Sequence, residues 1–108
     1  MVNKVYSDGT EYTGKWKNGL PNGYGKHIYP DGSYYKGNYE EGFKQGEGTF
    51  ECKNYKYSGQ WQNDEFHGRG HYTSSLYHIE YEGEYKNGIK HGFGKLLYAL
   101  ITKLFYIE

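Results

Sequence analysis

The sequence is poor in the features that stabilise or anchor many small proteins. Cys52 is the only cysteine among 108 residues, so no intrachain disulfide can form and a disulfide-stapled secreted scaffold is excluded. No stretch reaches the roughly 18 apolar residues of a membrane-spanning helix. The first residues, MVNKVYSDG, do not form an apolar signal segment. We therefore expect a cytoplasmic protein.

An excess of charge of either sign is also missing. The 13 basic and 13 acidic side chains are interspersed and give a formal net charge of zero. Proteins that bind nucleic acid normally carry a basic excess or a basic stripe. We therefore expect no nucleic-acid partner. The same balance argues against attachment to an anionic membrane through charge alone.

What the sequence has in abundance is aromatic rings and glycine. It contains 15 tyrosines, five phenylalanines, two tryptophans and 17 glycines, but only two prolines. The mean hydropathy of −1.04 is typical of disordered chains, yet disordered chains are poor in aromatic residues. The glycines also lack the strict period of collagen. The composition therefore indicates one folded domain that uses few aliphatic side chains.

The rings and glycines recur at fixed intervals. The pattern Y-x-G-x-[WY]-x-x-[GD]-x-x-x-G-x-G fits YTGKWKNGLPNGYG (12–25), YKGNYEEGFKQGEG (35–48), YSGQWQNDEFHGRG (57–70) and YEGEYKNGIKHGFG (81–94). Such self-similarity indicates a tandem repeat. The predicted units are 12–34, 35–56, 57–80 and 81–98, and residues 1–11 resemble the end of a further unit. We therefore expect the chain to begin inside a repeat, as a fragment of a longer array would.

Each unit predicts two short strands. Period-two alternation places Tyr12, Gly14 and Trp16 on one face, and Asn18-Gly19 supplies a hairpin turn. A helix is excluded because each interior glycine would cost about 1 kcal/mol relative to alanine. We predict that rings of one strand lie over glycines of a neighbouring strand. The predicted structural glycines are Gly14, Gly23, Gly25, Gly37, Gly46, Gly48, Gly59, Gly68, Gly70, Gly83, Gly92 and Gly94.

These units resemble the membrane occupation and recognition nexus (MORN) repeat, whose motif runs Y-x-G-x-W-x-x-G-x-x-H-G-x-G and is followed by an Asp-Gly turn. The resemblance covers residues 5–98. The histidine of the His-Gly pair is present as His67 and His91 but is replaced by Asn22 and Gln45. The third unit has Asp64 where the motif has glycine.

The resemblance implies an all-β fold, in which antiparallel hairpins stack into one elongated, twisted sheet with a groove along one face. It also implies a non-catalytic scaffold that binds proteins, at membranes or the cytoskeleton, and in some cases acidic phospholipids. Two alternatives stay open: direct binding of acidic phospholipid, and a regulatory fragment of a larger enzyme such as a phosphatidylinositol-phosphate kinase.

A single sheet cannot bury both faces, so rings that cover no glycine are expected to be exposed and to mark an interaction site. Tyrosine and tryptophan dominate binding hot spots. The predicted partner-binding groove consists of Tyr12, Trp16, Tyr39, Trp61, Tyr81 and Tyr85. A helix or extended peptide of a protein partner would fit it. Maintenance of the fold alone is the other interpretation of the same rings, and homodimerisation is a further alternative.

Other clusters give weak signals. On a strand, His67 and His71 would be about 13 Å apart between Cα atoms, and no C-x-x-C motif is present, so we expect no metal and no cofactor. Repeated hairpins offer no strained elbow for a nucleophile, so we expect no catalytic residues and no enzymatic activity. On the polar face, the expected headgroup ligands for the phospholipid alternative are Lys15, Lys26 and Lys36, whereas Glu80, Glu82 and Glu84 indicate a solvated surface.

The last segment, KLLYALITKLFYIE (95–108), breaks the repeat pattern. Its apolar residues recur at four-residue steps, which favours an amphipathic helix: Leu96, Leu97, Leu100, Ile101, Leu104 and Phe105. An open sheet needs protection at its end, so we predict that 99–108 is a capping segment. Self-association and shallow membrane insertion are the alternatives.

Overall fold

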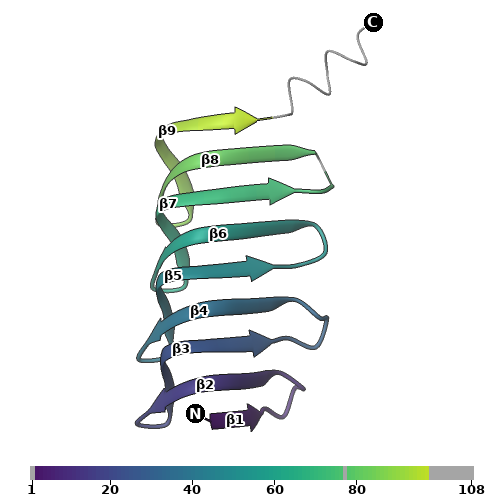
Figure 1. The fold of residues 1–108 in the computed structure, drawn as a ribbon, viewed down its shortest axis with the longest axis vertical. Coiled ribbons are helices and arrows are strands. Elements are labelled where there is room, and N and C mark those ends of the chain that lie inside the picture. Colours follow the sequence, from purple (N-terminus) through teal and green to yellow (C-terminus); the bar gives the residue numbers. More distant parts are fainter. Residues whose placement is uncertain (1, 77, 98–108) are drawn as a thin grey trace, which may run out of the picture.

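The computed structural model describes residues 2–76 and 78–97. These residues form nine strands and no helix. The strands are β1 (Val2–Val5), β2 (Glu11–Lys17), β3 (Leu20–Ile28), β4 (Tyr34–Glu40), β5 (Phe43–Glu51), β6 (Tyr55–Gln62), β7 (Glu65–Ser74), β8 (Ile79–Lys86) and β9 (Ile89–Leu97). They pair antiparallel in chain order in one open sheet (Figure 1). The predicted all-β, single-sheet architecture is confirmed.

Each repeat unit is a hairpin, and the four hairpins are β2–β3, β4–β5, β6–β7 and β8–β9. Their two-residue turns are Asn18-Gly19, Glu41-Gly42, Asn63-Asp64 and Asn87-Gly88, and both residues of each turn have a positive φ. Type I′ turns require this conformation, and they match the twist of the flanking strands. The hairpins stack into an elongated body of 57 × 28 × 17 Å (Figure 1).

A continuous row of glycines crosses the sheet from β2 to β9. Each glycine is the direct cross-strand partner of the next, in the order Gly14, Gly25, Gly37, Gly48, Gly59, Gly70, Gly83 and Gly94. Within every hairpin the register shifts just after the first of these glycines, for example between Gly59 and Trp61. Such β-bulges bend the strand. The row therefore lies where the sheet bends.

In the first three units, a buried tyrosine lies over the second glycine of the Gly-x-Gly sequence. A Cβ atom at Gly70 would clash with the ring and hydroxyl oxygen of Tyr57. The Tyr57 side chain is fully buried, and its hydroxyl donates to the carbonyl oxygen of Gln60, inside the bulge, at 2.7 Å. The same arrangement recurs as Tyr12 over Gly25 and Tyr35 over Gly48. Only glycine leaves room for the ring there.

The first glycine of each Gly-x-Gly pair has a different role. Gly23, Gly46 and Gly68 have positive φ values of 98°, 76° and 65°, a conformation that favours glycine. A Cβ atom at Gly68 would meet the side-chain amide of Gln60 rather than a ring. The expectation of a covering ring at Gly68 is therefore wrong. Its backbone conformation and the Gln60 amide account for the glycine.

The core is a ladder of aromatic rings on one face of the sheet, which we call the inner face. Tyr35 lies edge-on against Tyr39 of its own unit at 5.0 Å and against Trp61 of the next unit at 5.2 Å. Tyr57 repeats this pattern with Trp61 and Tyr85 at 5.1 and 5.4 Å. Edge-to-face pairs contribute about 0.5–1.5 kcal/mol beyond their burial. Ring contacts therefore hold successive units together.

The end of the described chain differs from the sequence-based prediction. Leu96 and Leu97 lie in β9, where they pair with Tyr81 and Glu80. The helix expected from Leu96 onward is wrong at these two positions, because the hairpin pairing of the fourth unit continues through them. The predicted capping segment, 99–108, lies outside the described residues. No helix long and apolar enough to span a membrane occurs in the part of the chain that the structure describes.

Candidate functional site

The structure places the residues of the predicted groove on the inner face, but most of them lie inside the core. The exposed fraction is at most 7% for five of the six, namely Tyr12, Tyr39, Trp61, Tyr81 and Tyr85, and Trp16 is half-buried. The expectation that these rings are exposed is wrong for the five, because rings of adjacent units pack against one another. Whether any of them binds a partner stays a prediction.

A second set of rings lies over this core and is half-buried. We call the part formed by Tyr29, Phe50, Tyr55 and Tyr72 the aromatic strip. Its rings follow one another across the sheet: Phe50 lies 6.3 Å from Tyr29 and 5.6 Å from Tyr55, and Tyr55 stacks on Tyr72 at 5.4 Å. The strip therefore gives the inner face a continuous aromatic surface from the residue after β3 to β7.

The sequence contained a signal for the strip that the groove prediction did not use. Phe50 and Tyr72 each follow a Gly-x-Gly pair by two residues, so period-two alternation puts them on the same face as those glycines. In the hairpin register Phe50 pairs with Tyr35, and Tyr72 pairs with Tyr57. Alternation alone does not show that the tyrosine of each pair is buried while its partner remains accessible.

A hollow of about 310 Å³ opens beside the aromatic strip. It is lined by Lys44, Phe50, Tyr55, Trp61, Asp64, Phe66 and Gly88. Lys44 supplies its cation: the Nζ atom lies 5.3 Å from the ring centroid of Tyr35 and 5.8 Å from that of Trp61. Burial lowers the pKa of Lys44, whereas the Asp64 carboxylate, 4.0 Å away, raises it.

Asp64, the departure from the glycine of the motif, belongs to this hollow. Its Oδ1 atom accepts the backbone N–H of Lys44 at 2.8 Å, and its own N–H donates to the Lys44 carbonyl oxygen at 3.2 Å. The carboxylate therefore fastens the turn of the third unit to the second unit. It also places an acidic group, about half exposed, at the rim of an aromatic hollow.

His27 and Tyr39 form a polar contact within the core, with 2.5 Å between the His27 Nδ1 atom and the Tyr39 hydroxyl oxygen. Burial, followed by the nearby Lys44 cation, lowers the pKa of His27. Burial likewise raises the pKa of Tyr39. Both side chains are therefore neutral at pH 7, and they share one hydrogen bond whose donor depends on the His27 tautomer. The contact orients rings of the core.

The remaining predicted residues do not converge on one site. The His71 Nε2 atom lies 2.5 Å from the Glu80 carboxylate, and the buried Nδ1 atom of His67 has no hydrogen-bond partner among the described residues. Within those residues, no group of three or more His, Cys, Asp or Glu side chains could hold a metal ion. On the outer face, opposite the inner face, Lys26 and Lys36 are direct cross-strand partners.

The comparison with known families agrees with the hairpin units. A family model described as the MORN repeat matches residues 12–34, 35–56, 57–75 and 81–99. A search of curated proteins found no match to the chain.

Proposed function

The chain belongs to the MORN-repeat family, and from this membership we propose that it is a non-catalytic scaffold that binds a protein partner along its inner face. MORN repeats are in general modules for interaction with proteins or membranes. One structural observation supports the proposal that the partner binds along the inner face. The aromatic strip of Tyr29, Phe50, Tyr55 and Tyr72 is only half-buried, whereas the core rings beneath it are buried.

The strip has the physical properties of a binding surface. Contiguous apolar surface that folding leaves accessible usually marks an interaction site. Tyrosine combines a large apolar ring with a hydroxyl that can bind a polar group at the edge of an interface. The rings of the strip contact one another, and Tyr29, Phe50 and Tyr72 also pack against the core, so a partner would have to immobilise few side chains on binding. Such preorganisation favours affinity.

The spacing of the repeats favours a helical partner. Equivalent rings recur once per hairpin, and two strands span about 10 Å. Positions i and i+7 of an α-helix are also about 10 Å apart along its axis and lie close to the same face. An extended peptide covers about 10 Å with three residues, which places successive equivalent side chains on opposite faces. We infer that an amphipathic helix lies along the stack of units.

The hollow at Lys44 and Asp64 supports one anchor on that helix. A large apolar side chain would contact Phe50, Tyr55 and Phe66 there. The half-exposed Asp64 carboxylate at the rim would favour a neighbouring basic or hydrogen-bond-donating residue of the partner. Anchors of this kind, with an aromatic pocket surrounded by polar groups, dominate the energy of many interfaces.

Two adjacent residues of β5 allow a matched test, because Phe50 lies on the inner face and Thr49 on the outer face. Phe50→Asp should abolish capture of the partner from native extract, since it places a charge in the aromatic strip. Thr49→Asp adds the same charge to the same strand and should leave capture unchanged. Circular dichroism and thermal melting would verify that both variants are folded. Equal capture by both folded variants would contradict the proposal.

A further inference from the structure

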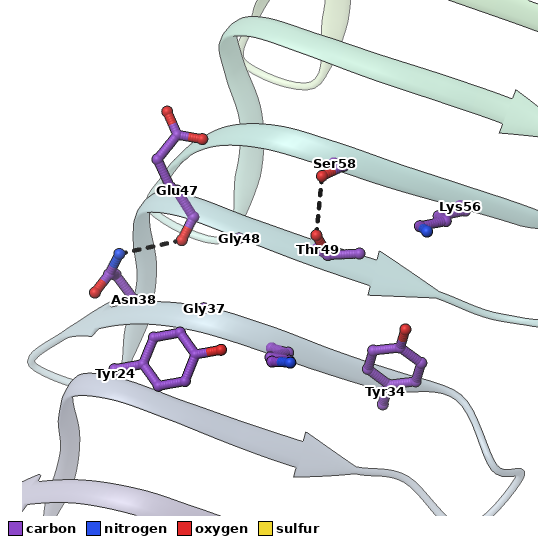
Figure 2. A pocket seen from close by; sticks show the side chains of 10 residues that line it. Tyr24, Tyr34, Gly37, Asn38, Glu47, Gly48, Thr49, Lys56 and Ser58 are labelled. Carbon is purple, nitrogen blue, oxygen red and sulfur yellow. Dashed lines mark hydrogen bonds between the residues drawn. The ribbon is translucent and has the colours of Figure 1, made fainter.

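The outer face contains a second, chemically different hollow of about 410 Å³ (Figure 2). Side chains from four strands, β3 to β6, line it: Tyr24, Tyr34, Lys36, Asn38, Glu47, Thr49, Lys56 and Ser58. Tyr24 and Tyr34 stand toward its two ends, and the backbone of Gly37 and Gly48 lies between the flanking side chains (Figure 2). This hollow lies on the opposite face from the aromatic strip.

Two lysines and two hydroxyls follow one another across the outer face, and all of them except Lys26 line the hollow. In the cross-strand register Lys26 pairs with Lys36, Lys36 with Thr49, and Thr49 with Ser58. We call these four side chains the outer row. Like charges placed directly opposite each other on neighbouring strands are destabilising. The Lys26–Lys36 pair is therefore a local cost that a bound anion would offset.

The cations at the hollow form no close ion pair with a carboxylate. Among the described residues, neither Lys36 nor Lys56 has a carboxylate oxygen within 4.0 Å of its Nζ atom. The Glu51 carboxylate, which is opposite Lys56 in the register, accepts the Tyr34 hydroxyl at 3.0 Å instead. Lys26 extends over the ring of Tyr34, with its Nζ atom 4.8 Å from the centroid. Glu47, at the far side of the hollow, is the one acidic residue that lines it.

The two hydroxyl groups of the outer row leave one O–H donor free for a ligand. Thr49 Oγ1 and Ser58 Oγ are 2.9 Å apart and share one hydrogen bond (Figure 2). One of the two hydroxyls donates within this pair, so the proton of the other is available to a ligand. The Asn38 amide makes one long bond, of 3.3 Å, to the Glu47 carbonyl oxygen, and it keeps a second N–H. Donors of two chemical types therefore surround the hollow.

We propose that this hollow binds a phosphate monoester carried by a soluble molecule, with Lys36 and Lys56 as the charged contacts. A phosphate monoester carries a charge of about −1.5 to −2 at pH 7 and has three strong acceptor oxygens. These oxygens match the two ammonium groups and the free hydroxyl proton. Tyr24, which is 48% exposed, offers a ring against which the organic part of the ligand can pack.

The charge distribution of the whole outer face favours a compact soluble anion over a membrane surface. Farther along the same face, β8 carries Glu82, which is the direct partner of His71, and Glu84, which is opposite Arg69. An anionic bilayer laid against this face would meet these carboxylates as well as the lysines. A single phosphate group reaches the hollow without contacting β8. The surroundings of the hollow therefore favour a small anion over an extended anionic surface.

The test is an NMR titration of the ¹⁵N-labelled full chain with phenyl phosphate in phosphate-free buffer. We expect saturable shifts confined to backbone amides around the hollow, including Gly37, Gly48 and Ser58. The double variant Lys36→Gln/Lys56→Gln should weaken binding at least tenfold, because each lysine contributes a charge-assisted hydrogen bond. The double variant Lys15→Gln/Lys17→Gln makes the same charge change on β2, outside the hollow. It should bind like the wild type.

Two further measurements distinguish loss of the binding site from unfolding, and a soluble phosphate ligand from a lipid. Lys36→Gln alone should raise the melting temperature in the absence of ligand, because it removes the Lys26–Lys36 repulsion, so weakened binding would not reflect unfolding. Vesicles of phosphatidylcholine with phosphatidic acid present the same phosphate chemistry on a lipid. The proposal is overturned if phenyl phosphate gives no saturable shifts, if both double variants lose binding equally, or if only the vesicles bind.

Discussion

At the scale of the residue, Tyr57 and Gly70 show how a ring and a missing side chain stabilise one bend of the sheet. The bulge of β6 at Gln60 leaves a carbonyl oxygen on its inner side, and the buried Tyr57 hydroxyl donates to it. For that hydroxyl to reach the bulge, its ring must lie flat on Gly70. Ring, glycine and bulge therefore depend on one another, and the repeat preserves them together.

Gly70→Ala should destabilise the protein by about 2–3 kcal/mol, the cost typical of an overpacked core, because its methyl group would displace the Tyr57 ring. Gly32→Ala is the matched control. Gly32 also has a positive φ, 88°, but a Cβ atom there would meet nothing within 4 Å, so this change should cost only about 1 kcal/mol of backbone strain. Urea unfolding measures both. Equal costs would show that the ring does not constrain Gly70.

At the scale of the element, the hairpin turns of the second, third and fourth units each bind the unit before them. The backbone N–H groups of Gly42 and Gly88 donate to the carbonyl oxygens of Pro21 and Phe66 at 2.9 and 2.8 Å. The residue after each of these acceptors occupies the histidine slot of the motif. In the first unit this residue is Asn22, whose Oδ1 atom accepts the N–H of Glu41 at 3.0 Å. In the first two units, where Asn22 and Gln45 replace histidine, the slot residue therefore supplies a hydrogen-bond acceptor for the next turn.

Gln45→Ala should weaken the junction between the second and third units. The Gln45 Oε1 atom accepts the backbone N–H of Asn63, and its removal should cost about 1 kcal/mol. It should also speed hydrogen exchange at Asn63 relative to the wild type. Gln62→Ala removes an amide of the same type from an exposed position in β6 and serves as the control. Unchanged exchange at Asn63 would contradict the role assigned to the slot.

The elements also show how far a sequence of this kind can be interpreted. The strands and turns were predicted correctly from the Tyr-x-Gly-x-Trp and Asn-Gly motifs. Strand alternation and the preference of type I′ turns for Asn-Gly both depend only on residues that are neighbours in the sequence. Alternation assigned Tyr12 and Tyr39 to the correct face but could not show that other rings cover them. That layering depends on the cross-strand register and on a bulge after Gly37. The outer row likewise depends on register, which brings together residues of four strands.

At the scale of the whole molecule, stability depends on a ladder of protonated tyrosines. Burial raises the pKa of Tyr57 from 10.0 to about 12, and burial also raises the pKa values of Tyr35, Tyr39 and Tyr85. An unfolded chain releases these protons near pH 10 whereas the folded chain keeps them. The corresponding stability is therefore complete below pH 10 and is lost as the pH rises toward 12.

We expect the urea midpoint to be nearly constant from pH 8 to about pH 9.5 and to fall steeply above pH 10. Absorbance at 295 nm, which reports tyrosinate, should rise together with the loss of β-sheet circular dichroism. Full ionisation of the tyrosines in a chain that keeps its sheet would contradict the buried ladder.

The whole molecule has two faces with separate chemistry, and the central claim is that a protein partner occupies the inner one. The most direct measurement is photo-crosslinking in the native cell with a photoreactive residue at position 50 or at position 49. Phe50 and Thr49 are adjacent in β5 but lie on opposite faces. The account predicts a discrete protein adduct from position 50 and none from position 49. Adducts from position 49 alone, or equally from both positions, would contradict it.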